Sequence, residues 1–164
     1  MSTAAHSPDQ RIVWPSGHSP ASAAVFAHNE VHINASPERV WSLLIDCTKW
    51  PQWYKHCTDV SVLDGGHVLQ KDATFRFKTL RTYFQPKVVI FEPYTSLVWE
   101  AQGPAWTSGA HAWHIEPSAT GCKVITEEAQ RGLLLSVIGG RVKKNLEFNH
   151  EDWLQSLKAL AESS

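Results

Sequence analysis

The stretch that decides how the chain begins to fold is Asn34-Ala35-Ser36-Pro37-Glu38-Arg39-Val40-Trp41. Ser36 can accept a backbone hydrogen bond as a helix N-cap, and Pro37 presets the φ angle of the first helical turn. Upstream, Val31 and Ile33 alternate with polar residues, which is the period of a half-buried strand. The stretch therefore predicts a strand that runs directly into a helix.

Further motifs follow this start. They are Trp50-Pro51-Gln52-Trp53-Tyr54, Phe91-Glu92-Pro93, His111-x-Trp113-x-Ile115-Glu116-Pro117 and Gly121-x-Lys123-Val124-x-Thr126-x-Glu128. Together they resemble the START-like, helix-grip (SRPBCC) superfamily, which contains polyketide cyclases and many lipid- or hormone-binding proteins, and in particular its polyketide cyclase/dehydrase-like branch. The resemblance covers about residues 25 to 161. It implies an α+β fold with an internal cavity for a ligand.

The remaining pattern predicts six more strands and one long helix. We expect the strands at residues 58–63, 73–80, 81–91 with an interruption at Pro86, 96–101, 109–115 and 122–131. Such strands form an antiparallel sheet, and the amphipathic helix at residues 133–161 must cover its apolar face. The expected fold is thus a helix-grip fold, in which a curved antiparallel sheet of about seven strands wraps around a long C-terminal helix. Two short helices follow the first strand.

Two features of the C-terminal helix stand out in its sequence. Gly139-Gly140 should bend the helix or divide it in two. Spacings of three and four residues predict one stripe that faces the sheet, formed by Val142, Leu146, Asn149, Trp153, Leu157 and Leu160.

Composition limits the class of protein. A chain of 164 residues with 43% apolar content fits one domain, expected at residues 24–162, and a formal net charge of −1 argues against a nucleic-acid partner. Three cysteines without C-x-x-C spacing argue against a disulfide framework, so the cytoplasm is the expected location. No apolar run approaches the roughly 20 residues that span a bilayer, so membrane insertion is not expected. A monomer and a homodimer both fit this pattern.

The first 23 residues are rich in Ser, Ala, Pro and His. Such a composition buries too little apolar surface to offset the entropy of ordering, so we expect residues 1–23 to be a flexible tail. The exception is Ile12-Val13-Trp14-Pro15, which leaves open a second possibility. This segment could fold back onto the domain or cover the cavity of a neighbouring molecule.

Alternation along the strands predicts which side chains face the helix and form the ligand site. The expected ligand-binding residues are Phe75, Phe77, Trp99, Trp113, Thr126, Gln130, Leu146, Asn149 and Trp153. Large aromatic rings offer apolar contact area and can stack on a flat ligand, although the same rings could simply fill the core. Trp53 and Trp106 lie beside Pro and Gly in flexible segments, so we expect them to gate the cavity mouth.

His111 and Glu128 are the candidate catalytic pair. A carboxylate on an apolar strand face needs a partner or a proton, and His111 on a nearby strand can supply either. Asn149 or His150 from the helix could complete a group that moves protons. The alternative is a purely structural pair. Because Glu127 faces away from Glu128, an error of one residue in the strand phase would exchange their roles.

Motifs for metals and cofactors are weak. His28-x-Glu30-x-His32 places two imidazoles and a carboxylate on one side of a strand, but we expect that side to face water. His111 and His114 point to opposite faces, and the other histidines lack zinc spacing. No Gly-rich phosphate loop is present. The sequence predicts neither a metal site nor a cofactor.

Two classes of function remain. The first is binding or carriage of a small, largely apolar ligand, whether lipid-, aromatic- or polyketide-like, in a cavity between the sheet and the C-terminal helix. The second is an enzyme similar to polyketide cyclases and aromatases, in which an inner His or Glu moves a proton. Because no clear catalytic motif is present, the sequence favours binding.

Overall fold

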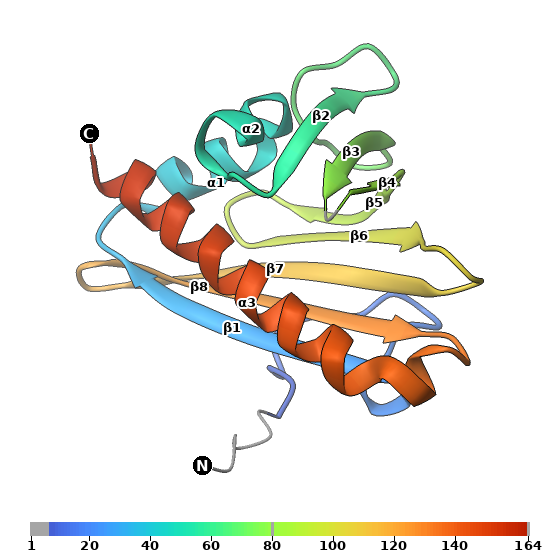
Figure 1. The fold of residues 1–164 in the computed structure, drawn as a ribbon. Coiled ribbons are helices and arrows are strands. Elements are labelled where there is room, and N and C mark those ends of the chain that lie inside the picture. The colour runs from blue at the N-terminus through green and yellow to red at the C-terminus, as the bar shows by residue number, and fades with distance from the viewer. Residues whose placement is uncertain (1–6, 80, 164) are drawn as a thin grey trace.

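The computed structural model describes residues 7–79 and 81–163. In these residues, eight strands form an antiparallel sheet of five and another of three, and the long helix α3 lies across the larger sheet (Figure 1). The elements in chain order are η1 (Pro20–Ser22), β1 (Val25–Ile33), α1 (Pro37–Ile45), η2 (Cys47–Lys49), α2 (Trp50–Trp53), β2 (Cys57–Val62), β3 (Phe75–Thr79), β4 (Thr82–Phe84), β5 (Lys87–Glu92), β6 (Ser96–Gln102), β7 (Ser108–Ser118), β8 (Gly121–Arg131) and α3 (Leu135–Glu162). This is the helix-grip fold that the sequence predicts.

Helix α1 begins where the sequence predicts it. Ser36 is in an extended conformation, and its hydroxyl accepts a hydrogen bond from the backbone N–H of Arg39 at 3.3 Å. Pro37 occupies the first helical position. The buried face of α1 carries Val40 and Trp41, which join the main core. Local sequence therefore determines both the start of this helix and the face that packs inward.

The five-stranded sheet has the order β1-β8-β7-β6-β5. In its register, Trp99 on β6 lies opposite His111 on β7, and His111 lies opposite Glu128 on β8. Because directly opposed residues in an antiparallel sheet share a face, these three side chains form a row on one side of the sheet. That side is the one covered by α3.

The smaller sheet corrects the expected number of strands. Residues 81–91 do not form one strand, because the chain divides around Pro86 into β4 and β5, which belong to different sheets. A proline lacks the N–H that a continuous ladder needs. A single bridge between Thr74 and Lys87 still links the two sheets. The described residues therefore contain eight strands, where about seven were expected.

Helix α3 is continuous through Gly139-Gly140, so, of the two expected alternatives, a bend or a division, the division does not occur. Its C-terminal half packs closely, with Asn149, Trp153 and Leu157 buried. Val142 and Leu146 in the N-terminal half are only half-buried. This half lies over a cavity, which is why its apolar residues remain partly uncovered.

The described part of the N-terminal segment packs against the large sheet. Residues 7–23 follow the face of the large sheet opposite α3, where Ile12 is 8% exposed (Figure 1). Ile12 contacts the short side chains of Ala110 and Ala112, and Trp14 packs near Phe26 with ring centroids 6.5 Å apart. The possibility that Ile12-Val13-Trp14-Pro15 folds back onto the domain is thus the one observed. Residues 1–6 lie outside the described residues.

Two further observations concern the class of protein. Within residues 7–79 and 81–163, no helix combines the length and the apolar character needed to cross a bilayer. Cys47, Cys57 and Cys122 are all buried free thiols, and burial raises the pKa of Cys47 to about 12. These buried thiols are therefore unreactive packing residues. The cytoplasmic location stays a prediction.

Candidate functional site

A cavity of about 350 Å³ lies between α3, the inner face of the large sheet and the small sheet. This volume is within the range of small-molecule sites. Its apolar wall is formed by Phe77, Phe84, Trp99, Ala101, Leu134, Leu135, Ile138, Val142, Leu146 and Trp153. Its polar side chains are Tyr54, Thr79, Thr107, Ser108, His111, Glu128, Gln130, Asn145, Asn149 and His150. Apolar atoms therefore form most of the surface that faces the cavity, although ten of its side chains carry a polar group.

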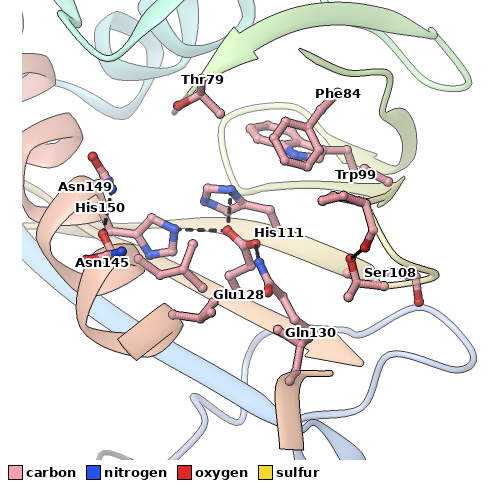
Figure 2. A pocket seen from close by; sticks show the side chains of 18 of the residues that line it. Thr79, Phe84, Trp99, Ser108, His111, Glu128, Gln130, Asn145, Asn149 and His150 are labelled. Carbon is pink, nitrogen blue, oxygen red and sulfur yellow. Dashed lines mark hydrogen bonds and ion pairs between the residues drawn. The ribbon is translucent and has the colours of Figure 1, made fainter. Parts of the chain in front are cut away.

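Three of the polar side chains, His111, Gln130 and His150, point toward Glu128 (Figure 2). Its Oε2 lies 3.1 Å from Nε2 of His150 on α3 and 3.4 Å from Nδ1 of His111 on β7. Its Oε1 accepts a hydrogen bond from Nε2 of Gln130 at 2.5 Å. Three separate elements, β7, β8 and α3, therefore bring their side chains to one carboxylate.

His111 is held from three sides. Its Nε2 lies 2.7 Å from the hydroxyl of Thr126, which neighbours it on β8. Its ring stacks on Trp113 with centroids 5.4 Å apart, and it lies 4.8 Å from the ring of Trp99. His111 is only 7% exposed. These contacts leave the imidazole little freedom to rotate.

Burial determines the charge states in this cluster. The pKa of His111 is lowered to about 3, mainly by burial and also by nearby His150, while the charge of Glu128 opposes both. Burial alone would raise the pKa of Glu128, but hydrogen bonds from His150 and Gln130 hold the pKa below its ordinary value. At neutral pH the cluster therefore contains an ionised Glu128 and a neutral His111. In a neutral His111, Nε2 can accept the hydroxyl proton of Thr126, and Nδ1 then points at Glu128 across 3.4 Å without a short hydrogen bond.

Glu127 lies on the other face of the sheet. It is fully buried, and its Oε1 accepts hydrogen bonds from the backbone N–H of Asp9 at 2.8 Å and from Nδ1 of His28 at 2.7 Å. Glu128 is therefore the member of the pair that faces the cavity. His28 is not solvated as expected, because its ring bonds to the buried Glu127 and its side chain is only 8% exposed.

Eight of the expected site residues line the cavity, namely Phe77, Trp99, His111, Glu128, Gln130, Leu146, Asn149 and Trp153. The other three expected ligand-binding residues, Phe75, Trp113 and Thr126, do not line the cavity but pack behind the residues that do. Phe75 packs against Trp50 with ring centroids 5.8 Å apart, Trp113 supports the ring of His111, and Thr126 bonds to that histidine. Strand alternation gives the correct face for these three residues but not their distance from the cavity.

The two expected gate residues do not line the cavity. Trp53 is half-buried against the main core. Trp106 is 96% exposed, although its neighbours Gly103, Pro104, Ala105 and Thr107 belong to the lining. Ala105 and Trp106 both have a φ of 54°, a left-handed conformation that is uncommon for residues with a Cβ. The loop thus reaches the cavity through its backbone and small residues, while the indole of Trp106 is in solvent.

Several lining residues were not predicted. On α3 and just before it they are Leu134, Leu135, Ile138 and Asn145. Val142 was expected on the stripe that faces the sheet but not among the ligand-binding residues, and His150 was named only as an alternative partner. The helical periodicity of the sequence could have placed four of the lining residues on one face of the helix, because they recur every three or four residues: Ile138, Val142, Asn145 and Asn149. Tyr54 and Phe84 come from short segments whose position depends on tertiary packing.

The family model described as polyketide cyclase / dehydrase and lipid transport matches residues 26–162. No curated protein matches the sequence significantly.

Solved structures share the fold at low sequence identity. A hypothetical protein from Helicobacter pylori is 23% identical with a TM-score of 0.85, covering 96% of this chain and 100% of that chain. The di-domain ARO/CYC StfQ from the steffimycin biosynthetic pathway is 15% identical with a TM-score of 0.71, covering 84% of this chain and 51% of that chain. Ara h 8.0201 is 9% identical with a TM-score of 0.68, covering 85% of this chain and 98% of that chain. The family match spans nearly all of the cavity-forming chain, and the protein therefore belongs to the polyketide cyclase/dehydrase and lipid transport family of the START-like helix-grip superfamily.

Proposed function

We propose that this protein binds or carries a small, largely apolar molecule in the cavity beneath α3. The observation that carries the proposal is the composition of the cavity, in which a mainly apolar wall surrounds one carboxylate and two imidazoles. The family description, which includes lipid transport and polyketide cyclisation, agrees with such a ligand. A lipid-, aromatic- or polyketide-like compound fits this chemistry.

The aromatic part of the wall supports a ligand with a flat or extended apolar body. Trp99 and Trp153 both line the cavity, with ring centroids 6.3 Å apart, and Phe77 and Phe84 lie on the small sheet. Burying apolar surface contributes about 25 cal/mol for each Å² removed from water. Most of the binding free energy would therefore come from this wall.

The polar cluster would orient the ligand. Glu128 is an acceptor whose two oxygens are already turned toward Gln130 and His150, so the cluster is organised before a ligand arrives. A hydroxyl or enol group on the ligand could donate to Glu128 in place of a water molecule. The ligand would then lie with its oxygen-bearing end at the cluster and its apolar body toward Trp99.

Native mass spectrometry of the purified protein, followed by organic extraction, tests whether a ligand is retained. We expect a mass above that of the bare chain and an extracted compound with an apolar body and at least one oxygen. An extracted compound that is highly charged throughout would contradict the proposal, because the apolar wall could not solvate it.

A neutral aromatic probe such as 1-aminoanthracene tests the location. Leu146→Trp should fill the cavity and weaken probe binding by about 10-fold or more, because the larger side chain occupies the space beside α3. Ala159→Trp is the matched control on an exposed position of the same helix. Equal probe affinity in both variants would place binding outside the cavity.

A second candidate function is proton transfer in a cyclisation or dehydration reaction. The observation that favours it is that Glu128 and His150 both line the cavity and lie 3.1 Å apart. Glu128 could accept a proton from the carbon next to a carbonyl. His150 could donate a proton to a departing hydroxyl, which leaves as water, and then recover a proton from Glu128.

Glu128→Gln separates the two functions. An amide keeps the shape and hydrogen-bonding capacity of the carboxyl group but is not a base. If the protein is an enzyme, turnover of a poly-β-ketone substrate followed by liquid chromatography and mass spectrometry should fall by about 100-fold or more. An unchanged rate in this variant would remove Glu128 from the chemistry and leave binding as its role.

A further inference from the structure

We propose that His111, Glu128 and His150 form a zinc-binding site that opens into the cavity. The nitrogen and oxygen atoms that these residues present lie within 4.8 Å of one another. Sequence spacing could not reveal this set, because the three ligands come from β7, β8 and α3. The fold brings together two histidines that are 39 positions apart in the chain.

Two of the three ligand-pair distances already fit tetrahedral coordination, and the two imidazole nitrogens, within 4.8 Å of one another, would move closer on binding a metal. Zinc bonds to histidine nitrogen and carboxylate oxygen are about 2.0–2.2 Å long, which places neighbouring ligand atoms roughly 3.3 Å apart in a tetrahedron. Oε2 of Glu128 lies 3.1 Å from Nε2 of His150 and 3.4 Å from Nδ1 of His111. The distance from Oε2 of Glu128 to each imidazole nitrogen is therefore already close to the distance between two ligand atoms of one zinc ion.

A hydrogen-bonded cluster without metal explains these distances less well. The bond between His150 and Glu128 has an ordinary length, but 3.4 Å is longer than the usual 2.7–3.2 Å for an N–H donor and an oxygen. His111 instead makes its short contact through the other nitrogen, to Thr126. Nδ1 of His111 is therefore directed at Glu128 without completing a good hydrogen bond.

Two of the three proposed ligands, His111 and Glu128, have the partners typical of a second coordination shell, whereas Nδ1 of His150 is buried without a hydrogen-bond partner among the described residues. Metal-binding histidines usually donate their other N–H to an oxygen, which sets the tautomer and the orientation of the ring. Nε2 of His111 has such a partner in Thr126 at 2.7 Å. Gln130 likewise holds Oε1 of Glu128 and leaves Oε2 to the metal. Thr126 and Gln130 are therefore positioning residues for the proposed site.

Three protein ligands leave one tetrahedral position free. Two histidines and one glutamate with an open fourth position are the ligand set of catalytic zinc sites, in contrast to closed structural sites with four protein ligands. All three ligands line the cavity, so the free position faces its interior. A ligand that carries a carbonyl, enol or carboxylate oxygen would complete the coordination. This last step rests on the proposed function, whereas the metal site itself does not.

Metal binding to the untagged full chain tests the site directly. After removal of metals with a chelator, titration with Zn²⁺ should show one tight site per chain by calorimetry. Titration with Co²⁺ should give the intense visible absorption of a tetrahedral site, and one equivalent of Zn²⁺ should abolish it. If Co²⁺ gives only the weak spectrum of the hydrated ion, the proposal is wrong, and this result does not depend on any variant.

Variants locate the metal. Glu128→Gln and His150→Ala should each weaken Zn²⁺ binding by more than about 10-fold, and Thr126→Val should weaken it by about 10-fold through loss of second-shell support. His114→Ala removes a buried histidine from the opposite face of β7, and His32→Ala removes an exposed one, so both should bind Zn²⁺ as the wild type does. Loss of the tight site in His32→Ala, with retention in Glu128→Gln, would assign the metal to the surface and overturn the proposal.

The aromatic-probe titration distinguishes this inference from the proposed function. If the protein binds 1-aminoanthracene but no Zn²⁺, the cavity is a ligand site without metal and only the inference fails. If the protein binds Zn²⁺ at the cluster but no apolar probe, the metal site stands and the proposed function fails. Circular dichroism of each variant confirms that it is folded before its affinity is compared.

Discussion

His111 on β7 and Glu128 on β8 are directly opposed in the antiparallel register, and Nδ1 of His111 lies 3.4 Å from Oε2 of Glu128. The sheet therefore presents this imidazole and this carboxylate to the same cavity without help from any loop. His150 then reaches the same oxygen from α3 at 3.1 Å. Because strands position side chains more precisely than loops do, the cluster is rigid before any ligand binds.

Trp113→Ala should destabilise the fold and weaken probe binding. Trp113 is 1% exposed and supports the ring of His111 from behind, so its removal leaves a void beside the cluster. We expect a loss of about 3–5 kcal/mol in the free energy of unfolding, measured by urea denaturation. His32→Ala, on an exposed position of β1, should change neither stability nor probe binding. Equal effects of the two substitutions would contradict the assigned strand phase.

Ile12→Ala should destabilise the fold, because this residue fills the space above Ala110 and Ala112. We expect a decrease of about 2 kcal/mol in the free energy of unfolding. Val13→Ala is a matched control, since Val13 is 62% exposed and should change stability by less than about 0.5 kcal/mol. If Ile12→Ala is as stable as the control, residues 7–23 do not dock on the sheet in solution.

Stability should depend on pH through His28. The hydrogen bond to Glu127 raises the pKa of His28 above 6.5, burial opposes this, and the charges of Glu127 and Glu30 add to the increase. A raised pKa means that folding favours the protonated form, so this contribution is complete below pH 6.5 and is lost as the pH rises through the folded-state value. Urea midpoints measured from pH 6 to 9 should fall more in the wild type than in Glu127→Gln. Parallel curves would show that the pair does not contribute to the pH dependence.

A role of Trp106 as a gate predicts a kinetic effect without an effect on affinity. Trp106 is 96% exposed, so Trp106→Ala should change stability by less than about 0.5 kcal/mol. Its loop lines the cavity, so a smaller side chain should speed association and dissociation of 1-aminoanthracene equally, as measured by stopped-flow fluorescence. Phe148→Ala, an exposed aromatic residue on α3 outside the lining, is the control. Identical rates in the two variants would exclude Trp106 as the gate.

The sequence predicts the inner face of the sheet well because alternation in a strand is a local rule. Once Val124 faces the helix, Thr126 and Glu128 must share its face and Glu127 must lie on the other. The register of β7 and β8 agrees with this assignment. The sequence does not predict how far each inner residue lies from the cavity, which is why Phe75 and Trp113 were expected in the lining but belong to the packed core.

Longer-range arrangements escaped prediction for a physical reason. Polar composition argued for a flexible N-terminal tail, yet Ile12 is buried because Ala110 and Ala112 on distant strands leave room for it. Histidine spacing gave no sign that His111 and His150 are neighbours, yet their ring centroids lie 4.7 Å apart. Both outcomes depend on contacts between segments far apart in the chain, and no local pattern encodes such contacts.

The sequence by itself determined the features that arise from neighbouring residues. These are the helix that starts at Ser36 and Pro37, the faces of the strands, and the amphipathic helix α3. The tertiary structure alone decided that His150 joins His111 and Glu128, and that the N-terminal segment covers Glu127. The reason is that hydrogen-bond and rotamer preferences act within a few residues, whereas the position of α3 over the sheet follows from packing of the whole core.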